Sequence, residues 1–165
     1  MPPIALFSVQ FTFCLVAYAL IAGWYVVPRL FGLPRAVALV PLLWVHAFRI
    51  AGATILAPGA VDAAIPTDFR TMVGLGDLTT AVLALVAIVL LRRSASLAIA
   101  AVWLFLVVGT ADTVNAIIQS VRYDVFTFPL GLNWVIVTMY VPALLVSSLL
   151  ILATLVGWGR LGRVE

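Results

Sequence analysis

The chain has 165 residues, of which 65% are apolar and only 9% are charged, and its net charge is +3. A soluble domain carries about 25% charged residues, so the composition excludes an ordinary water-soluble protein and favours a membrane protein. All nine basic residues are arginines that mostly stand at the ends of apolar runs, which excludes a nucleic-acid-binding patch, and without lysine there can be no Schiff base.

Five apolar runs follow one another along the chain, each near or above the roughly 20 residues that a helix needs to cross a bilayer. The first run ends at Pro28-Arg29, the second at Pro58-Gly59, the third at Arg92-Arg93 and the fifth at Gly159-Arg160. The sequence therefore predicts an all-α chain with a single transmembrane domain over residues 1–165. Its five spans are expected at about residues 4–27, 36–57, 71–91, 95–118 and 130–158.

The arginines outside the spans predict the orientation of the chain. If every run crosses the membrane, six of them share one side, and only Arg70 and Arg122 lie on the other. Arginine-rich links stay in the cytoplasm, so we expect the N-terminus outside, the C-terminus inside, and a multi-pass protein of the bacterial inner membrane. The six are Arg29, Arg35, Arg92, Arg93, Arg160 and Arg163.

Glycine and proline residues inside the spans predict local features of the helices. Pro41 and Pro142 are candidate kinks, because proline removes a backbone hydrogen bond. Gly74 and Gly76 are expected to be points of close helix packing.

Several polar residues lie within the predicted spans, where lipid is a poor solvent for them. A charged group at the bilayer centre costs roughly 2.5–3.5 kcal/mol, so these side chains are expected to face inward and to pair. With a rise of about 1.5 Å per residue, they fall between about 5 and 16 Å from the outer end of their spans. We therefore predict a polar site in the outer half of the bundle, formed by Gln10, His46, Arg49, Asp77, Asp112, Asn115 and Asn133.

We interpret the centre of this site as an ion cluster in which Arg49 pairs with Asp77, Asp112 or both. The planar guanidinium stays charged and accepts two carboxylates well. One arginine against two carboxylates leaves a formal charge of −1, which a proton, a charged His46 or a bound cation could neutralise. The cluster is either a structural pin that fixes helix register or a site for a ligand, ion or proton.

His46 is the only histidine, and three roles remain open for it. It is a hydrogen-bonded core residue, a proton relay, or a ligand to haem or a metal ion. One histidine with neither cysteine nor glutamate nearby makes a poor metal set, so no metal site is predicted.

Three short motifs follow one another between residues 46 and 81. They are Phe48-Arg49-x-x-Gly52, then Pro66-x-x-Phe69, and then Gly76-Asp77. This pattern resembles an uncharacterised family of small multispanning bacterial membrane proteins, for which no activity is known. The resemblance implies that Arg49 and Asp77 belong together.

Three functions are compatible with these features. The first is a bundle that binds or transports a small molecule, ion or proton, working as a homo-oligomer because it is small. The second is an accessory or anchor subunit of a larger membrane complex, with a quinone or haem near His46. The third is an intramembrane enzyme acting on a lipid or isoprenoid, with Asp77 or Asp112 as general acid or base. No particular cofactor is predicted, and the partners expected are the bilayer, a ligand and other membrane subunits.

Overall fold

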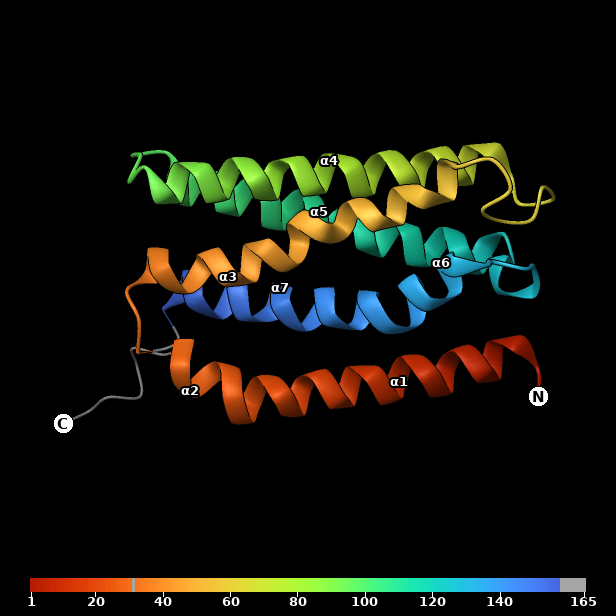
Figure 1. The fold of residues 1–165 in the computed structure, drawn as a ribbon, viewed down its shortest axis with the longest axis horizontal. Helices are drawn as coiled ribbons and strands as arrows, with labels where there is room; N and C mark the ends of the chain where they lie inside the picture. Colours follow the sequence, from red (N-terminus) through yellow and green to blue (C-terminus); the bar gives the residue numbers. More distant parts are fainter. Residues whose placement is uncertain (31, 158–165) are drawn as a thin grey trace.

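The computed structural model describes residues 1–30 and 32–157, and within them the fold is a bundle of long helices lying side by side (Figure 1). In this described part of the chain, five helices are long and apolar enough to cross a membrane, in agreement with the predicted all-α fold and its five expected spans. Trp158, Arg160 and Arg163, at and beyond the predicted end of the fifth span, lie outside the described residues. The five spans are Pro3–Leu30, Arg35–Leu56, Thr67–Arg92, Ala98–Arg122 and Leu132–Val156.

Three of the five spans change helix type along their length. The first consists of α1 (Pro3–Ile21), a π-helical segment η1 (Ala22–Val26) and α2 (Val27–Leu30). The second passes from α3 (Arg35–Ala47) into the 3₁₀ helix η2 (Phe48–Leu56). The third and fourth are the single helices α4 (Thr67–Arg92) and α5 (Ala98–Arg122), followed by the short 3₁₀ turn η3 (Val125–Thr127). The fifth comprises α6 (Leu132–Val135), the π-helical η4 (Ile136–Tyr140) and α7 (Val141–Val156).

Two prolines explain the π-helical segments. A proline lacks the N–H that would bond the carbonyl four residues earlier, and its ring clashes with that carbonyl. The carbonyl four residues before Pro28 belongs to Trp24, and the one four residues before Pro142 belongs to Thr138. Trp24 and Thr138 both lie inside the π-helical segments. The wider π turn relieves the clash without ending the helix. The first helix therefore continues to Leu30, whereas the sequence alone suggested that it ends at residue 27.

The helices are arranged with α4 at one edge of the bundle and α1 at the other. α4 packs against α5, η2 and α3, while α7 packs against α3 and α1 (Figure 1). α1 has no buried residue and makes its main contacts with α7, η4 and η3. It is thus the peripheral helix, with most of its surface available to lipid.

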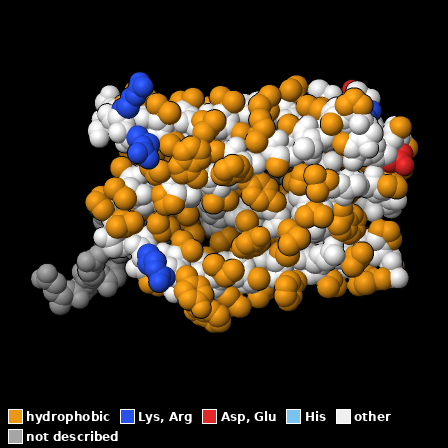
Figure 2. Space-filling view, viewed as in Figure 1, with side chains coloured by type: hydrophobic (Ala, Val, Ile, Leu, Met, Phe, Trp, Pro, Cys, Tyr) orange, Lys and Arg blue, Asp and Glu red, His pale blue; other side chains and the backbone are white. Residues whose placement is uncertain are grey.

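The two ends of the bundle differ in charge, and the surface between them is apolar (Figure 2). At one end, here called the arginine end, lie Arg29, Arg35, Arg92 and Arg93. At the other, here called the loop end, lie the N-terminus and the links 57–66 and 123–131, which carry Asp62 and Asp124. Asp68 lies at the same end, in the first turn of α4. Large apolar side chains are exposed on every span, which places the helices in contact with the lipid bilayer. Examples are Phe13, Trp44, Val82, Val107 and Leu149.

Two apolar cores fill the two ends of the bundle. The larger one occupies the arginine-end half and includes Leu43, Val102, Phe105 and Ile151. The smaller one closes the loop end, where Ile65 and Phe126 belong to it and Phe7 packs on it. The buried charges and a cavity lie between these two cores.

Candidate functional site

The centre of the site is an ion cluster built from three helices. Arg49 on η2 donates Nε–H to Oδ1 of Asp77 on α4 and Nη2–H to Oδ2 of Asp112 on α5. Its third nitrogen, Nη1, lies 3.2 Å from the backbone carbonyl oxygen of Gly109. The Arg49 side chain keeps only 5% of its surface exposed, so its charge is satisfied inside the protein rather than by water. The predicted ion pairing of Arg49 is confirmed, and both carboxylates take part.

The 3₁₀ conformation of η2 aligns the residues that form this cluster. Side chains three residues apart lie directly above one another on a 3₁₀ helix. Arg49, Gly52 and Ile55 follow this spacing, and they are the buried residues of the segment. A 3₁₀ run of nine residues is long, since such helices usually extend for only three or four residues.

Glycines let the three helices approach closely enough for the charges to meet. A Cβ atom at Gly52 would overlap the Asp77 carboxylate, and one at Gly76 would overlap that of Asp112. A Cβ atom at Gly109 would stand 2.8 Å from the methyl carbon of Thr80. The cluster therefore requires glycine on each of the three helices. The close packing expected at Gly76 is confirmed, and Gly74 packs in the same way against Leu56.

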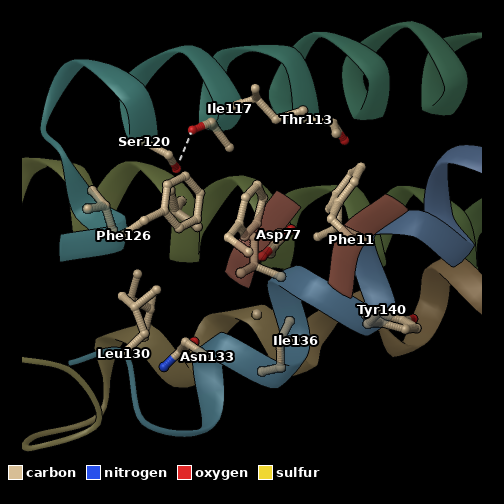
Figure 3. A pocket seen from close by; sticks show the side chains of 18 of the residues that line it. Phe11, Asp77, Thr113, Ile117, Ser120, Phe126, Leu130, Asn133, Ile136 and Tyr140 are labelled. Carbon is tan, nitrogen blue, oxygen red and sulfur yellow. Dashed lines mark hydrogen bonds between the residues drawn. The ribbon is translucent and has the colours of Figure 1, made fainter. Parts of the chain in front are cut away.

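A cavity of about 290 Å³ adjoins the ion cluster on its loop-end side. α5 contributes Thr113, Ile117 and Ser120 to one wall, and the segment from Leu130 to Tyr140 forms the facing wall (Figure 3). The lining is mostly apolar, and its charged members are Arg49 and Asp77. Pockets for small ligands begin near this size, so the cavity can hold a small organic molecule.

Asn133 is the polar residue of the cavity wall whose hydrogen bonding is incomplete. Its side chain is buried, and its Oδ1 accepts a hydrogen bond of 3.2 Å from the Thr54 hydroxyl. Its amide nitrogen, Nδ2, has no hydrogen-bond partner in the described part of the chain. A buried donor without a partner is costly, which marks Asn133 as a polar group of the cavity wall that the described residues do not fully satisfy.

His46 is buried one turn before Arg49 but does not line the cavity. Its ring packs edge-on against Phe105, with ring centroids 4.8 Å apart. Neither imidazole nitrogen has a hydrogen-bond partner among the described residues, which differs from the hydrogen-bonded role considered above. Within those residues no group of three or more histidine, cysteine, aspartate or glutamate side chains could hold a metal ion.

Gln10 and Asn115 lie apart from the ion cluster. Gln10 accepts a hydrogen bond of 2.7 Å from the Trp134 indole and so ties α1 to α6. Asn115 is exposed, and its amide lies 3.0 Å from the sulfur of Met72 on α4. Of the seven predicted site residues, the structure joins Arg49, Asp77 and Asp112 directly and places Asn133 on the adjoining cavity.

The sequence reasoning missed some residues that shape the site. Tyr140, which lines the cavity, donates its hydroxyl to the Val45 carbonyl and so holds η4 against α3. Phe7 and Phe126 stack with centroids 4.0 Å apart at the loop end of the cavity. The signal for Tyr140 was its spacing of seven residues from Asn133, which puts both on one helix face, but the aromatic stack joins segments that are far apart in sequence.

A family model matches residues 6–156, which is most of the chain. The chain belongs to the domain of unknown function DUF8737. The resemblance noted in the sequence implied a family of multispanning proteins without a known activity. The match confirms that the chain belongs to a family of unassigned function, and the described residues form five long apolar helices. No curated protein and no solved structure matches the chain.

Proposed function

We propose that this DUF8737 protein is a membrane receptor for a small amphipathic molecule, with a polar group at Asp77 and Asn133 and an apolar body in the cavity. The observation that carries the proposal is the junction of the cavity with the ion cluster. A purely structural pin would not need a cavity beside it, and open space removes packing contacts that stabilise a bundle.

We favour ligand binding over transport of the ligand through the bundle. The cavity extends from the ion cluster toward the loop end, whereas tightly packed apolar side chains fill the arginine-end half. A transporter in this conformation would be closed on that side. Transport would require the larger core to open, and binding requires no such change.

The proposed orientation has the loop end outside the cell. Arg29, Arg35, Arg92 and Arg93 at the arginine end outnumber Arg70 and Arg122 at the loop end, and such an excess marks the cytoplasmic side. The cavity would then lie in the outer half of the membrane.

Cysteine labelling tests this orientation. In a Cys14→Ser background, a membrane-impermeant maleimide added to intact cells should label Gly59→Cys in the loop-end link. It should not label Ala95→Cys in the link at the arginine end. The reverse pattern would show that the orientation is inverted.

Native mass spectrometry of protein extracted gently from its own membrane tests the binding function. We expect one additional discrete mass bound to each chain. The control variant Asp68→Asn, changed at the loop end, should keep this additional mass. Asp77→Asn should reduce its occupancy about 10-fold or more, because a buried charge-assisted hydrogen bond contributes roughly 1.5–3 kcal/mol. Bare chains, or an adduct indifferent to Asp77→Asn, would refute the proposal. The same spectrum tests the predicted homo-oligomer.

A further inference from the structure

The exposed residues of the cavity lining lie on α1 and α5, which points to an opening between these two helices. Ile4 on α1 and Ile117 and Val121 on α5 all line the cavity, and they are 52%, 44% and 64% exposed. Ile4 and Val121 lie near the loop-end termini of their helices, and Ile117 lies one turn further in, so the exposed part of the lining is on the side of the bundle toward the loop end. α1 makes its main contacts with α7, η4 and η3, whereas α5 packs chiefly on α4, so the two helices leave a gap.

The loop end of the cavity is covered, which leaves the lateral gap as the access route. Phe126 and Leu130 line the cavity and belong to the apolar core that closes this end. The Phe7–Phe126 stack extends that cover to α1, and Asp62 N–H donates a 3.0 Å hydrogen bond to the Pro129 carbonyl, joining the two links above it. A molecule dissolved in the bilayer reaches the cavity more directly than one dissolved in water.

The charge of the cluster indicates what kind of molecule this is. Arg49, Asp77 and Asp112 are the charged residues in the middle of the spans, and together they carry one positive and two negative charges. Arg49 bonds one oxygen of Asp77, Oδ1, while Oδ2 takes part in neither ion pair. The Asp77 side chain keeps 14% of its surface exposed and lines the cavity. A positive charge placed there would complete the balance of a buried cluster that is otherwise uncompensated.

We propose that the ligand is a membrane-dissolved lipophilic amine that enters between α1 and α5 and places its ammonium group against Asp77. The inference rests on the binding function proposed above and specifies its ligand class. The apolar body of the amine fills the cavity, and the single positive charge offsets the extra carboxylate. The competing arrangement is a proton shared within the cluster, which would make the cavity selective for neutral molecules.

Binding of a matched pair of probes separates these arrangements. 4-Phenylbutylamine and 4-phenylbutanol have nearly the same shape, and at neutral pH only the amine is charged. Equilibrium dialysis against the full chain in lipid nanodiscs, with empty nanodiscs as background, gives the affinity for each. We expect the amine to bind about 10- to 100-fold more tightly than the alcohol, as a buried charge-assisted hydrogen bond implies.

Two carboxylate variants test the charge. Asp77→Asn leaves Arg49 paired with Asp112, and Asp112→Asn leaves it paired with Asp77, so each cluster is neutral and keeps an ion pair. Both variants should lose the preference for the amine, and Asp77→Asn should lose it completely. Asp68→Asn at the loop end should keep it.

Two tryptophan variants on α5 test the access route. Ile117→Trp places a large ring at the rim of the cavity, whereas Ile118→Trp places it on the next residue, which is 58% exposed and does not line the cavity. The first should slow the entry of the amine, measured as the time course of its uptake by the protein in nanodiscs, and the second should leave that rate unchanged. Equal rates of uptake in both variants would overturn lateral access.

Each remaining outcome is also decisive. If amine and alcohol bind with equal affinity and Ile117→Trp weakens the binding of both, the assignment of the ligand as an amine is overturned. The receptor function then remains in place. An amine preference that survives Asp77→Asn would likewise overturn the assignment. If neither probe binds, the ligand class falls, and the native mass spectrum decides separately whether the receptor function falls with it.

Discussion

Replacing Arg49 by methionine should destabilise the bundle strongly. The change removes both charge-assisted hydrogen bonds to Asp77 and Asp112 and leaves two carboxylates in the interior without a cation. Such bonds contribute roughly 1.5–3 kcal/mol each, and breaking a buried ion pair typically costs about 3–5 kcal/mol. We therefore expect the free energy of unfolding to fall by about 4 kcal/mol.

Unfolding by sodium dodecyl sulfate in mixed micelles, followed by circular dichroism, measures this loss. Arg122→Met is the matched control, because that side chain is exposed at the loop end and loses only a contact with the Tyr123 ring, so its change should stay within about 1 kcal/mol. The triple variant Arg49→Met, Asp77→Asn, Asp112→Asn removes every charge while nearly preserving shape. It should recover at least about half of the lost stability, because uncharged amides cost less to bury than carboxylates. A loss below about 1 kcal/mol in Arg49→Met, or no recovery in the triple variant, would refute the reasoning.

Two further changes probe the contacts around the site. Gly52→Ala should cost about 1–3 kcal/mol in the same unfolding assay, because its methyl group overlaps the Asp77 carboxylate. Gly23→Ala is the control, since nothing lies within 4 Å of its added carbon, and equal losses in both would contradict the packing argument. Gln10→Leu removes the hydrogen bond to Trp134, so backbone amides of α1 should exchange with deuterium faster while those of α4 do not change. An unchanged α1 would show that this bond does not hold the helix.

The buried charges show how far reasoning from the sequence reached. An arginine or aspartate in an apolar span must face inward and pair, so Arg49, Asp77 and Asp112 could be expected to meet. Asn115, however, comes three residues after Asp112 and so seemed to share its face. Three residues turn an α-helix by about 300°, so the two side chains point in directions about 60° apart. That difference is enough to direct Asn115 to Met72 on an exposed face, away from the cluster.

Local changes of helix type were only partly accessible from the sequence. Pro28 was expected to end its helix and Pro142 to kink its own, but proline is compatible with a helix end, a kink or a π turn. Which one occurs depends on whether neighbouring helices keep the chain extended beyond the proline. The 3₁₀ segment Phe48–Leu56 has no proline or other sequence signal, and its register follows from the contact of Gly52 with Asp77 on another helix.

The sequence by itself determined that this protein lies in lipid rather than in water, how many spans it has, and which residues are too polar to face lipid. These properties depend on composition and on the length of each apolar run, which are local. Only the tertiary structure decided that one arginine bonds both carboxylates, that glycines on three helices make room for them, and that a cavity adjoins the ion cluster. Those features depend on how closely helices distant in sequence approach one another, and side-chain volumes at their crossing points set that distance.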